Sequence, residues 1–299
     1  MSAETTFTVL GGDLRQAAVA SLLARSFRVQ SWAVPTQDLS LLVIEQKDWR
    51  TALQDTDILV LPLPASPDSK HLYAPYCTDS AEKPPLIKEV LEAVPSHVLV
   101  TGGRMSESVC ALLSARGISY FDYFKNERLQ QANAIPTAEG AVEILMREIP
   151  RTIHGLAVGI TGFGRVGQAL ARLLVAMGAS VTVAARREET LLQVRRMGCR
   201  GILLDSPEAL RGLADCAAIF NTVPQQIFTG EALVALPQTQ LLVDLASAPG
   251  GFEGAAIAAL GRRVIFALSL PGKYAPITAG EIIADAILER IGRGGGTIV

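Results

Sequence analysis

The sequence has few residues that could hold a metal ion or form a disulfide framework. Its 299 residues include 4 cysteines and 3 histidines. Cys77, Cys110, Cys199 and Cys216 lie far apart, and no CxxC pair or neighbouring set of histidines accompanies them. Neither a zinc site nor a disulfide scaffold fits this spacing. We therefore predict no bound metal and four reduced cysteines in the protein core.

The chain also lacks a strong excess of charge and a long apolar run. Lys+Arg number 27 and Asp+Glu 29, so the formal net charge is −2, which argues against nucleic acid or an anionic membrane as a partner. The apolar stretch 169–185 is interrupted by Arg172 and contains Gly178, whereas a membrane span needs roughly 18 uninterrupted apolar residues. The start, MSAETTFTVLGG, has no basic segment before an apolar one. We expect a soluble, cytoplasmic protein.

The motifs of common hydrolases are missing too. His71, His97 and His154 lie in unrelated contexts, and there is no GxSxG sequence. The sequence supplies no obvious nucleophile. This favours chemistry in which a cofactor carries the difficult step.

What the sequence does contain is a regular alternation of short apolar runs and amphipathic stretches, typical of an α/β protein with open parallel sheets. In the first 125 or so residues we expect an open parallel sheet of about five strands. The predicted strands are Thr6–Leu10, Arg28–Val34, Ile58–Leu63, His97–Thr101 and Ile118–Asp122. The predicted helices between them are Leu14–Ser26, Leu86–Val94 and Met105–Arg116.

A segment rich in Pro, Ser and Asp, residues 64–85, is too long for an ordinary connection. We predict a lid, an insertion or a contact loop here, and its role stays open at this stage.

Four parts follow from these patterns: a first domain over residues 1–136, a connecting helix over 137–152, a Rossmann domain over 153–272, and a C-terminal helix over 273–299 that packs back on the first domain. Pro136 should end the first domain because proline disfavours a helical predecessor, and Thr137 should then cap the connecting helix.

Six strands are expected in the Rossmann domain, namely Leu156–Thr161, Ser180–Ala184, Gly201–Leu204, Ala217–Asn221, Gln240–Asp244 and Val264–Phe266. Two domains of this kind predict a cleft that closes on a substrate.

The most informative motif is a GxGxxG sequence between a predicted strand and a predicted helix. Gly162 allows the tight turn, Gly164 lets the backbone approach a pyrophosphate, and Gly167 lets helix and strand pack closely. The helix N-terminus offers free N–H groups and a positive dipole end to the phosphates. A dinucleotide site at this turn also includes the neighbours Thr161, Phe163, Arg165 and Val166.

Arginines stand where an NAD-selective domain has an acidic residue. Arg186 lies 19 positions after Gly167 and Arg187 follows it. A guanidinium there can hold the 2′-phosphate of NADP, so NADP is favoured and NAD remains possible. The alternative is that the two arginines merely begin a solvated helix.

Two further loops should face the dinucleotide because they follow the fourth and fifth strands of the Rossmann domain. The expected residues are Asn221, Thr222, Val223, Pro224, Asp244, Ala246 and Ser247. For Asp244 a role as a loop anchor is an equal alternative.

Cationic residues at other strand ends could hold a carboxylate substrate. Arg15 follows the first strand in GGDLRQ, Arg104 follows a later strand, and Lys273 lies in LPGKYAPITAG. Asp13 could equally be a helix cap, Arg104 a surface residue and Lys273 a solvated lysine.

Together, GGDLRQ, AIPTAEG, GFGRVGQ, AARR, NTVP, DLASAPGG and LPGKYAPITAG resemble the A-subunit family of dipicolinate synthases, from about residue 7 to 291. More distantly, the layout is similar to 2-hydroxy-acid dehydrogenases, although their ordered Arg, Glu and His set is missing. This similarity implies that residues 1–136 form a flavodoxin-like substrate domain beside the Rossmann domain. The resemblance implies NADP-dependent oxidation of dihydrodipicolinate to dipicolinate in the mother-cell cytoplasm of a sporulating bacterium. It also implies a second, flavoprotein-like B subunit, in a homo- or hetero-oligomer.

The implied substrate carries two carboxylates, for which Arg15, Arg104 and Lys273 are the candidate ligands. Glu139 or Asp13 could accept the proton, and so could water. Two other functions stay open. One is a nucleotide-binding scaffold or regulatory protein whose partner performs the oxidation. The other is a dehydrogenase of another small carboxylate.

Overall fold

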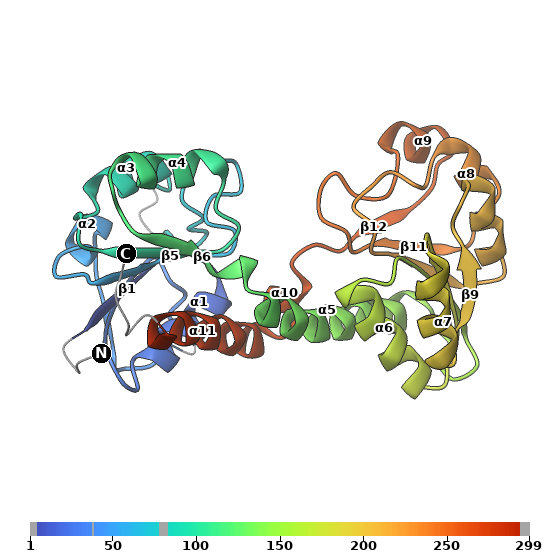
Figure 1. Ribbon diagram of the computed structural model, residues 1–299, viewed down its shortest axis with the longest axis horizontal. Helices are drawn as coiled ribbons and strands as arrows, with labels where there is room; N and C mark the ends of the chain where they lie inside the picture. Colours follow the sequence, from blue (N-terminus) through green and yellow to red (C-terminus); the bar gives the residue numbers. More distant parts are fainter. Residues whose placement is uncertain (1–4, 38, 78–82, 294–299) are drawn as a thin grey trace. The chain divides into compact units, whose positions relative to one another are not determined.

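The computed structural model describes residues 5–37, 39–77 and 83–293 (Figure 1). The chain divides into two compact units, the first made of Met1–Asn133 and Ala275–Val299, the second of Ala134–Tyr274. Residues 78–82 of the predicted insertion and 294–299 of the predicted C-terminal segment lie outside the described residues. Each unit is built on one fully parallel six-stranded sheet, so the expected α/β class is confirmed.

The first unit has a sheet of order β3-β2-β1-β4-β5-β6. Its strands are β1 (Thr6–Leu10), β2 (Arg28–Trp32), β3 (Val43–Glu45), β4 (Ile58–Val60), β5 (Leu99–Gly102) and β6 (Tyr120–Asp122). Its helices are α1 (Leu14–Leu23), α2 (Trp49–Ala52), α3 (Ile87–Ala93), α4 (Glu107–Ala115) and α11 (Pro276–Arg293), with the 3₁₀ turn η1 (Tyr123–Lys125).

One edge strand, β3, and the short helix α2 were not predicted. β3 has three residues, of which only Val43 is buried, so no apolar alternation marks it. Without β3 the remaining strands have the expected flavodoxin-like order, because β1 lies between β2 and β4. With β3 the first sheet has the same strand order as a dinucleotide-binding sheet.

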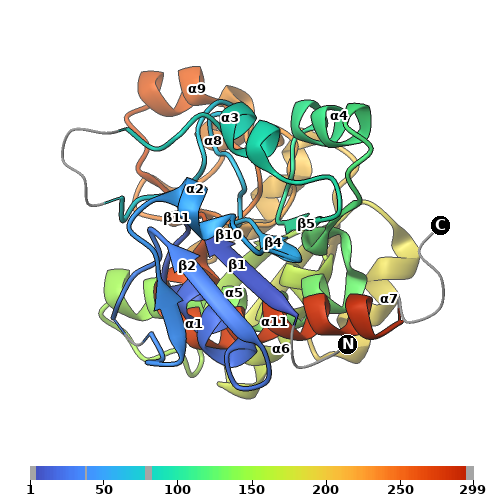
Figure 2. The same cartoon turned by 90° about the vertical axis from the view of Figure 1, so that its left-hand side faces the viewer.

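Helices cover both faces of the first sheet, α1 and α11 on one face and α2, α3 and α4 on the other (Figures 1 and 2). Alternating residues of β1 enter two different cores: Phe7 and Val9 pack with α1 and α11, whereas Leu10 packs with α2, α3 and α4. The C-terminal helix α11 thus belongs to the first unit, as the sequence patterns predicted. Gly280 allows this, because a Cβ atom there would lie 2.4 Å from the Cβ of Ala18.

The predicted start of the connecting helix is wrong. The helix α5 (Glu127–Glu148) begins ten residues before Thr137 and contains Pro136. The Asn126 side chain accepts hydrogen bonds from the backbone N–H groups of Arg128 (2.9 Å) and Leu129 (3.2 Å) and so begins the helix. Pro136 is buried, and the packing of the helix outweighs the lost backbone hydrogen bond.

The second unit has a sheet of order β12-β11-β10-β7-β8-β9, which is the order of a Rossmann fold. Its strands are β7 (Ala157–Thr161), β8 (Ser180–Ala185), β9 (Arg200–Leu203), β10 (Ala218–Asn221), β11 (Leu241–Asp244) and β12 (Val264–Phe266). Its other elements are α6 (Arg165–Ala176), α7 (Glu188–Arg196), η2 (Pro207–Leu213), α8 (Gly230–Val234), α9 (Gly254–Ala259) and α10 (Leu270–Tyr274). All six predicted strands are present. The turn α10 was not predicted as helical.

Of the four cysteines predicted in the core, Cys199 and Cys216 are buried, whereas Cys77 and Cys110 are partly exposed. Burial raises the pKa of Cys216 to about 11, so this thiol is protonated at neutral pH. Within the described residues no cluster of side chains could ligate a metal ion, and no helix is both long and apolar enough to cross a membrane.

Candidate functional site

The turn between β7 and α6 is built by three glycines with different tasks. Gly162 has a φ of +89°, and a Cβ atom there would lie 2.4 Å from Thr222 Oγ1. A Cβ atom on Gly167 would lie 2.4 Å from the carbonyl oxygen of Gly162. A Cβ atom on Gly164 would instead project into open space. The turn therefore leaves an open cradle at the N-terminus of a helix of 12 residues, which fits a pyrophosphate.

Substitution of Gly164 and of Gly167 should have different effects on binding and on stability. Gly164→Ala should leave the melting temperature of the free protein nearly unchanged and weaken dinucleotide binding by about tenfold or more, because the methyl group would fill the cradle. Gly167→Ala should lower the free energy of unfolding by about 1–3 kcal/mol, because its methyl group meets main chain. Thermal unfolding and fluorescence titration with the dinucleotide separate the two. Equal loss of stability in both variants would contradict the assignment.

A cavity of about 640 Å³ continues from this turn. Eight predicted residues line it, namely Gly162, Phe163, Gly164, Arg186, Arg187, Thr222, Val223 and Pro224. Ala184, Ala185, Thr190 and Leu204 also line it and were not predicted. The sequence feature that could have identified these four residues is their position. They lie at or just after the ends of β8 and β9, or on the first turn of α7. The adenosine end of a dinucleotide lies at such strand ends in Rossmann folds.

Among the residues that the structure describes, no carboxylate lines this cavity, whereas both arginines do. Arg186 directly follows β8 and donates a hydrogen bond from Nη1 to Gln225 Oε1 (3.2 Å), and Arg187 is the residue before α7. Both are exposed, as the alternative of a solvated helix start also requires. The positive charge at this end of the cavity matches a ligand with a phosphate on the ribose.

Three predicted cofactor residues, Thr161, Asn221 and Asp244, do not line the cavity but form a buried network of hydrogen bonds. Thr161 Oγ1 donates to Asn221 Oδ1 (2.7 Å), and Asn221 Nδ2 donates to Asp244 Oδ1 (2.8 Å). Asp244 also accepts hydrogen bonds from the backbone N–H groups of Ala246 (3.1 Å) and Gly251 (2.8 Å). Asp244 therefore anchors the loop after β11, which is the alternative role that the sequence offered for this residue. The chain of hydrogen bonds ties together the ends of β7, β10 and β11.

The remaining predicted cofactor residues also lie outside the cavity lining. Arg165, Val166 and Gly167 form the first turn of α6, and Ala246 and Ser247 belong to the loop after β11. Ala246 is buried and Ser247 is exposed.

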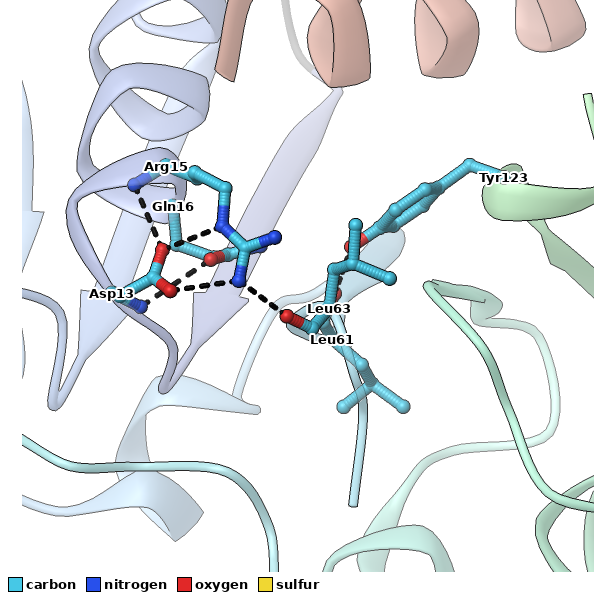
Figure 3. Close-up of polar contacts among 6 residues, drawn as sticks. All are labelled: Asp13, Arg15, Gln16, Leu61, Leu63 and Tyr123. Atoms are coloured by element: carbon cyan, nitrogen blue, oxygen red, sulfur yellow. Dashed lines mark hydrogen bonds and ion pairs between the residues drawn. The ribbon is translucent and has the colours of Figure 1, made fainter. Parts of the chain in front are cut away.

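In the first unit the predicted substrate residues Asp13 and Arg15 form a compact polar cluster at the start of α1 (Figure 3). Arg15 is only 4% exposed. Its Nε and Nη2 atoms donate to the two carboxylate oxygens of Asp13 at 2.8 and 2.7 Å, and Nη2 also donates to the carbonyl oxygen of Leu63 (2.5 Å). Asp13 accepts a hydrogen bond from the backbone N–H of Arg15 as well, so it is the helix cap that the sequence offered as an alternative.

The pair strongly favours a charged arginine. Burial alone would lower the pKa of Arg15, but the hydrogen bonds and charge of Asp13 outweigh burial and place that pKa above its ordinary value. The third guanidinium nitrogen, Nη1, has no dashed line in Figure 3 and no hydrogen bond to the described part of the chain. It is the one donor group of Arg15 that a ligand could still use.

Two neighbouring side chains complete the cluster. Gln16 is fully buried, and its Oε1 accepts a hydrogen bond from the N–H of Asp13 (3.4 Å). Tyr123 donates to the carbonyl oxygen of Leu61 (3.1 Å), and burial raises its pKa well above the ordinary range. Sequence reasoning missed Tyr123, because its distance of 108 residues from Arg15 gives no local signal.

The other predicted substrate residues are Arg104, Glu139 and Lys273. Arg104 has a left-handed φ of +52°, donates its N–H to Asp122 (3.0 Å), and places its guanidinium 5.8 Å from the ring centre of Phe124. Glu139 on α5 and Lys273 on α10 are exposed and belong to the second unit. Within the first unit the structure thus joins Asp13 and Arg15 by hydrogen bonds and gives the backbone of Arg104 a different partner.

Known proteins show the same two-part organisation. Residues 6–124 match the model of the N-terminal domain of the dipicolinate synthase A subunit. Residues 126–270 match the D-isomer specific 2-hydroxyacid dehydrogenase NAD binding domain. The second unit is therefore a nicotinamide dinucleotide-binding domain of the dehydrogenase type, and the chain is of the oxidoreductase class.

Relatives match nearly the full chain. The A subunit of dipicolinate synthase from Bacillus subtilis (strain 168) is 27% identical over 290 residues, which cover 93% of both chains. The crystal structure of the A subunit from Bacillus halodurans has a TM-score of 0.82 at 28% identity, with coverage of 96% of this chain and 97% of that one. The crystal structure of the Bacillus subtilis A chain has a TM-score of 0.83 at 26% identity and covers 98% and 97%. The resemblance predicted from the motifs is confirmed, and the chain is a relative of the dipicolinate synthase A subunit over nearly its whole length.

Proposed function

We propose that this chain oxidises dihydrodipicolinate, formed from the product of dihydrodipicolinate synthase, to the aromatic dipicolinate with NADP as the oxidant. The observation that carries the proposal is the arginine-lined cavity beside the glycine turn, in a chain similar to the dipicolinate synthase A subunit over 93% of its length. We further propose that it works with a second, flavoprotein-like protein, the B subunit.

The reaction requires the loss of two hydrogens from the ring, one as hydride and one as a proton, and gains the stability of an aromatic ring. NADP would supply the hydride acceptor. Gly162, Gly164 and the N-terminus of α6 would hold its pyrophosphate, and Arg186 with Arg187 would hold its 2′-phosphate.

The substrate carries two carboxylates, and Arg15 is the best candidate to hold one of them. Its guanidinium is fixed by Asp13 and Leu63, so it loses little side-chain freedom on binding, and Nη1 is still available as a charged donor. Arg104 and Lys273 are the candidates for further contacts with the substrate.

For the proton, Glu139 and water are better candidates than Asp13. Both carboxylate oxygens of Asp13 accept hydrogen bonds from Arg15, whereas Glu139 is exposed. The gain of aromaticity makes a strong base unnecessary, so substitution of Glu139 need not abolish turnover.

The test supplies the purified chain with dihydrodipicolinate made in situ by dihydrodipicolinate synthase, together with NADP or NAD. Reduced cofactor and dipicolinate are measured together, first without the flavoprotein-like partner and then with it. Equal amounts of both products from this chain alone are the expected result. Product only in the presence of the partner would move the oxidation to a shared or partner-borne site, and the chain would then be a nucleotide-binding scaffold. No product in either case would refute the proposal.

A further inference from the structure

A side-chain hydrogen bond links the loop after β10 to the residue that follows β8. Arg186 donates from Nη1 to Oε1 of Gln225 (3.2 Å), which lies four residues after β10 ends at Asn221. The strand β7, which leads into the glycine turn, lies between β8 and β10 in the sheet. The hydrogen bond therefore joins the two loops that flank this turn. Both loops line the cavity, one through Arg186 and the other through Pro224.

The loop after β10 is held on both sides of Gln225. Before it, the N–H of Val223 donates to Asn221 Oδ1 (3.1 Å), and Asn221 Nδ2 donates to the carbonyl oxygen of Val223 (3.0 Å). After it, the N–H of Ile227 donates to the carbonyl oxygen of Gly251 (3.0 Å). The amide of Gln225 therefore belongs to a loop that is fixed at both ends.

These anchors connect to the buried network of Thr161, Asn221 and Asp244. Asn221 is itself a member of the network, and Asp244 Oδ2 accepts a hydrogen bond from the N–H of Gly251 (2.8 Å). The network thus fixes both flanks of the loop that carries Gln225. In this way buried side chains that do not line the cavity contribute to the placement of a group beside it.

Gln225 leaves the charge and the binding edge of Arg186 available. Among the described residues Arg186 bonds to this neutral amide and to no carboxylate, so its positive charge is not compensated. Its Nε and Nη2 groups have no partner in the described part of the chain. These two groups form the edge of a guanidinium that can donate two parallel hydrogen bonds to a phosphate.

We propose that Gln225 is a specificity-determining residue that selects a dinucleotide with a 2′-phosphate. It holds Arg186 by Nη1, so that the edge formed by Nε and Nη2 is presented to the phosphate. Gln225 acts through Arg186 and is therefore a positioning residue. Because the long arginine side chain is held before the ligand binds, less side-chain entropy is lost on binding. The inference rests on the proposed use of NADP.

The first test compares Gln225→Glu with Gln226→Glu by fluorescence titration with NADP and with NAD. Gln225→Glu should raise the dissociation constant of NADP by about tenfold or more, because the new carboxylate would pair with Arg186 and repel the phosphate. The constant for NAD should change by no more than about twofold. Gln226 is exposed and lies outside the cavity lining, so Gln226→Glu adds the same charge one residue away. It should change the constant for NADP by less than about threefold, because exposed charges are screened by salt.

The second test removes the acceptor without adding a charge. Gln225→Ala should raise the dissociation constant of NADP by roughly 3- to 5-fold, as expected for one hydrogen bond to a charged group, and leave that of NAD unchanged. In an Arg186→Ala background the same substitution should have no effect on NADP, since no guanidinium is left to hold. All these variants should keep the melting temperature of the wild type, because both side chains are exposed.

Three results would overturn the inference. They are equal losses of NADP and NAD affinity in Gln225→Glu, an equally large loss of NADP affinity in Gln226→Glu, and an undiminished effect of Gln225→Ala in the Arg186→Ala background. The proposed use of NADP would still stand if Arg186→Asp alone weakened NADP selectively. If the wild type binds NAD as tightly as NADP, the proposed cofactor fails, and the inference fails with it.

Discussion

Arg186→Asp is expected to weaken NADP binding by at least about 100-fold and to change NAD binding by no more than about threefold. A charge-assisted hydrogen bond to phosphate contributes roughly 1.5–3 kcal/mol, and the new carboxylate would in addition repel the 2′-phosphate. NAD has a hydroxyl at that position, which can donate a hydrogen bond to an aspartate. Fluorescence titration of the purified variant with each dinucleotide measures both dissociation constants.

The matched control is Arg195→Asp, which makes the same change of charge on the last turn of α7, outside the cavity lining. It should leave both dissociation constants within a factor of about two, because exposed charges at a distance are screened by salt. Arg186 is exposed, and its hydrogen bond in the described structure goes to Gln225, so the melting temperature should not change either. Equal losses for NADP and NAD would refute the 2′-phosphate assignment.

The dinucleotide-binding half was predictable because its signals are local. Each strand from β7 to β12 is a short apolar run between helices, and the three glycines stand in a strand–turn–helix context that few other structures use. Position relative to a strand end was also enough to predict that Arg186 lines the cavity. It was not enough to separate cavity residues from their support: Asn221 and Asp244 are the last residues of β10 and β11, but their side chains bond to each other and do not line the cavity.

What sequence reasoning missed depends on tertiary contacts. Pro136 lies inside α5 because packing outweighs its local preference, and only Asn126, ten residues earlier, marks the true start of the helix. The position of Tyr73 against the β1–α1 turn depends on a hydrogen bond from the N–H of Gly12, 61 residues away in the chain, to its carbonyl oxygen. The burial of Arg15 likewise follows from Leu63, on the loop after a different strand.

Asp13→Ala should destabilise the first unit by about 3–5 kcal/mol, because it leaves the guanidinium of Arg15 buried without its counter-ion. The side chains of Arg15 and Asp13 are 5% and 19% exposed, so water can replace the lost carboxylate only in part. The loss of the helix cap is included in this figure and accounts for about 1 kcal/mol. Chemical denaturation of the purified variant measures the change.

Asp48→Ala is the matched control, since Asp48 caps α2 through the N–H of Thr51 (3.0 Å) and forms no ion pair with a buried arginine within the described residues. It should cost only about 1 kcal/mol, the ordinary value of a cap. The double variant that combines Asp13→Ala with Arg15→Met should regain much of the stability that Asp13→Ala alone loses. With both charged groups removed, no unpaired charge is left in the core. The same double variant should lose affinity for dipicolinate, because the charged donor has gone. If the double variant is as unstable as Asp13→Ala alone, the pair stabilises the turn through side-chain packing and helix capping, and its ion pair contributes little to the free energy of unfolding.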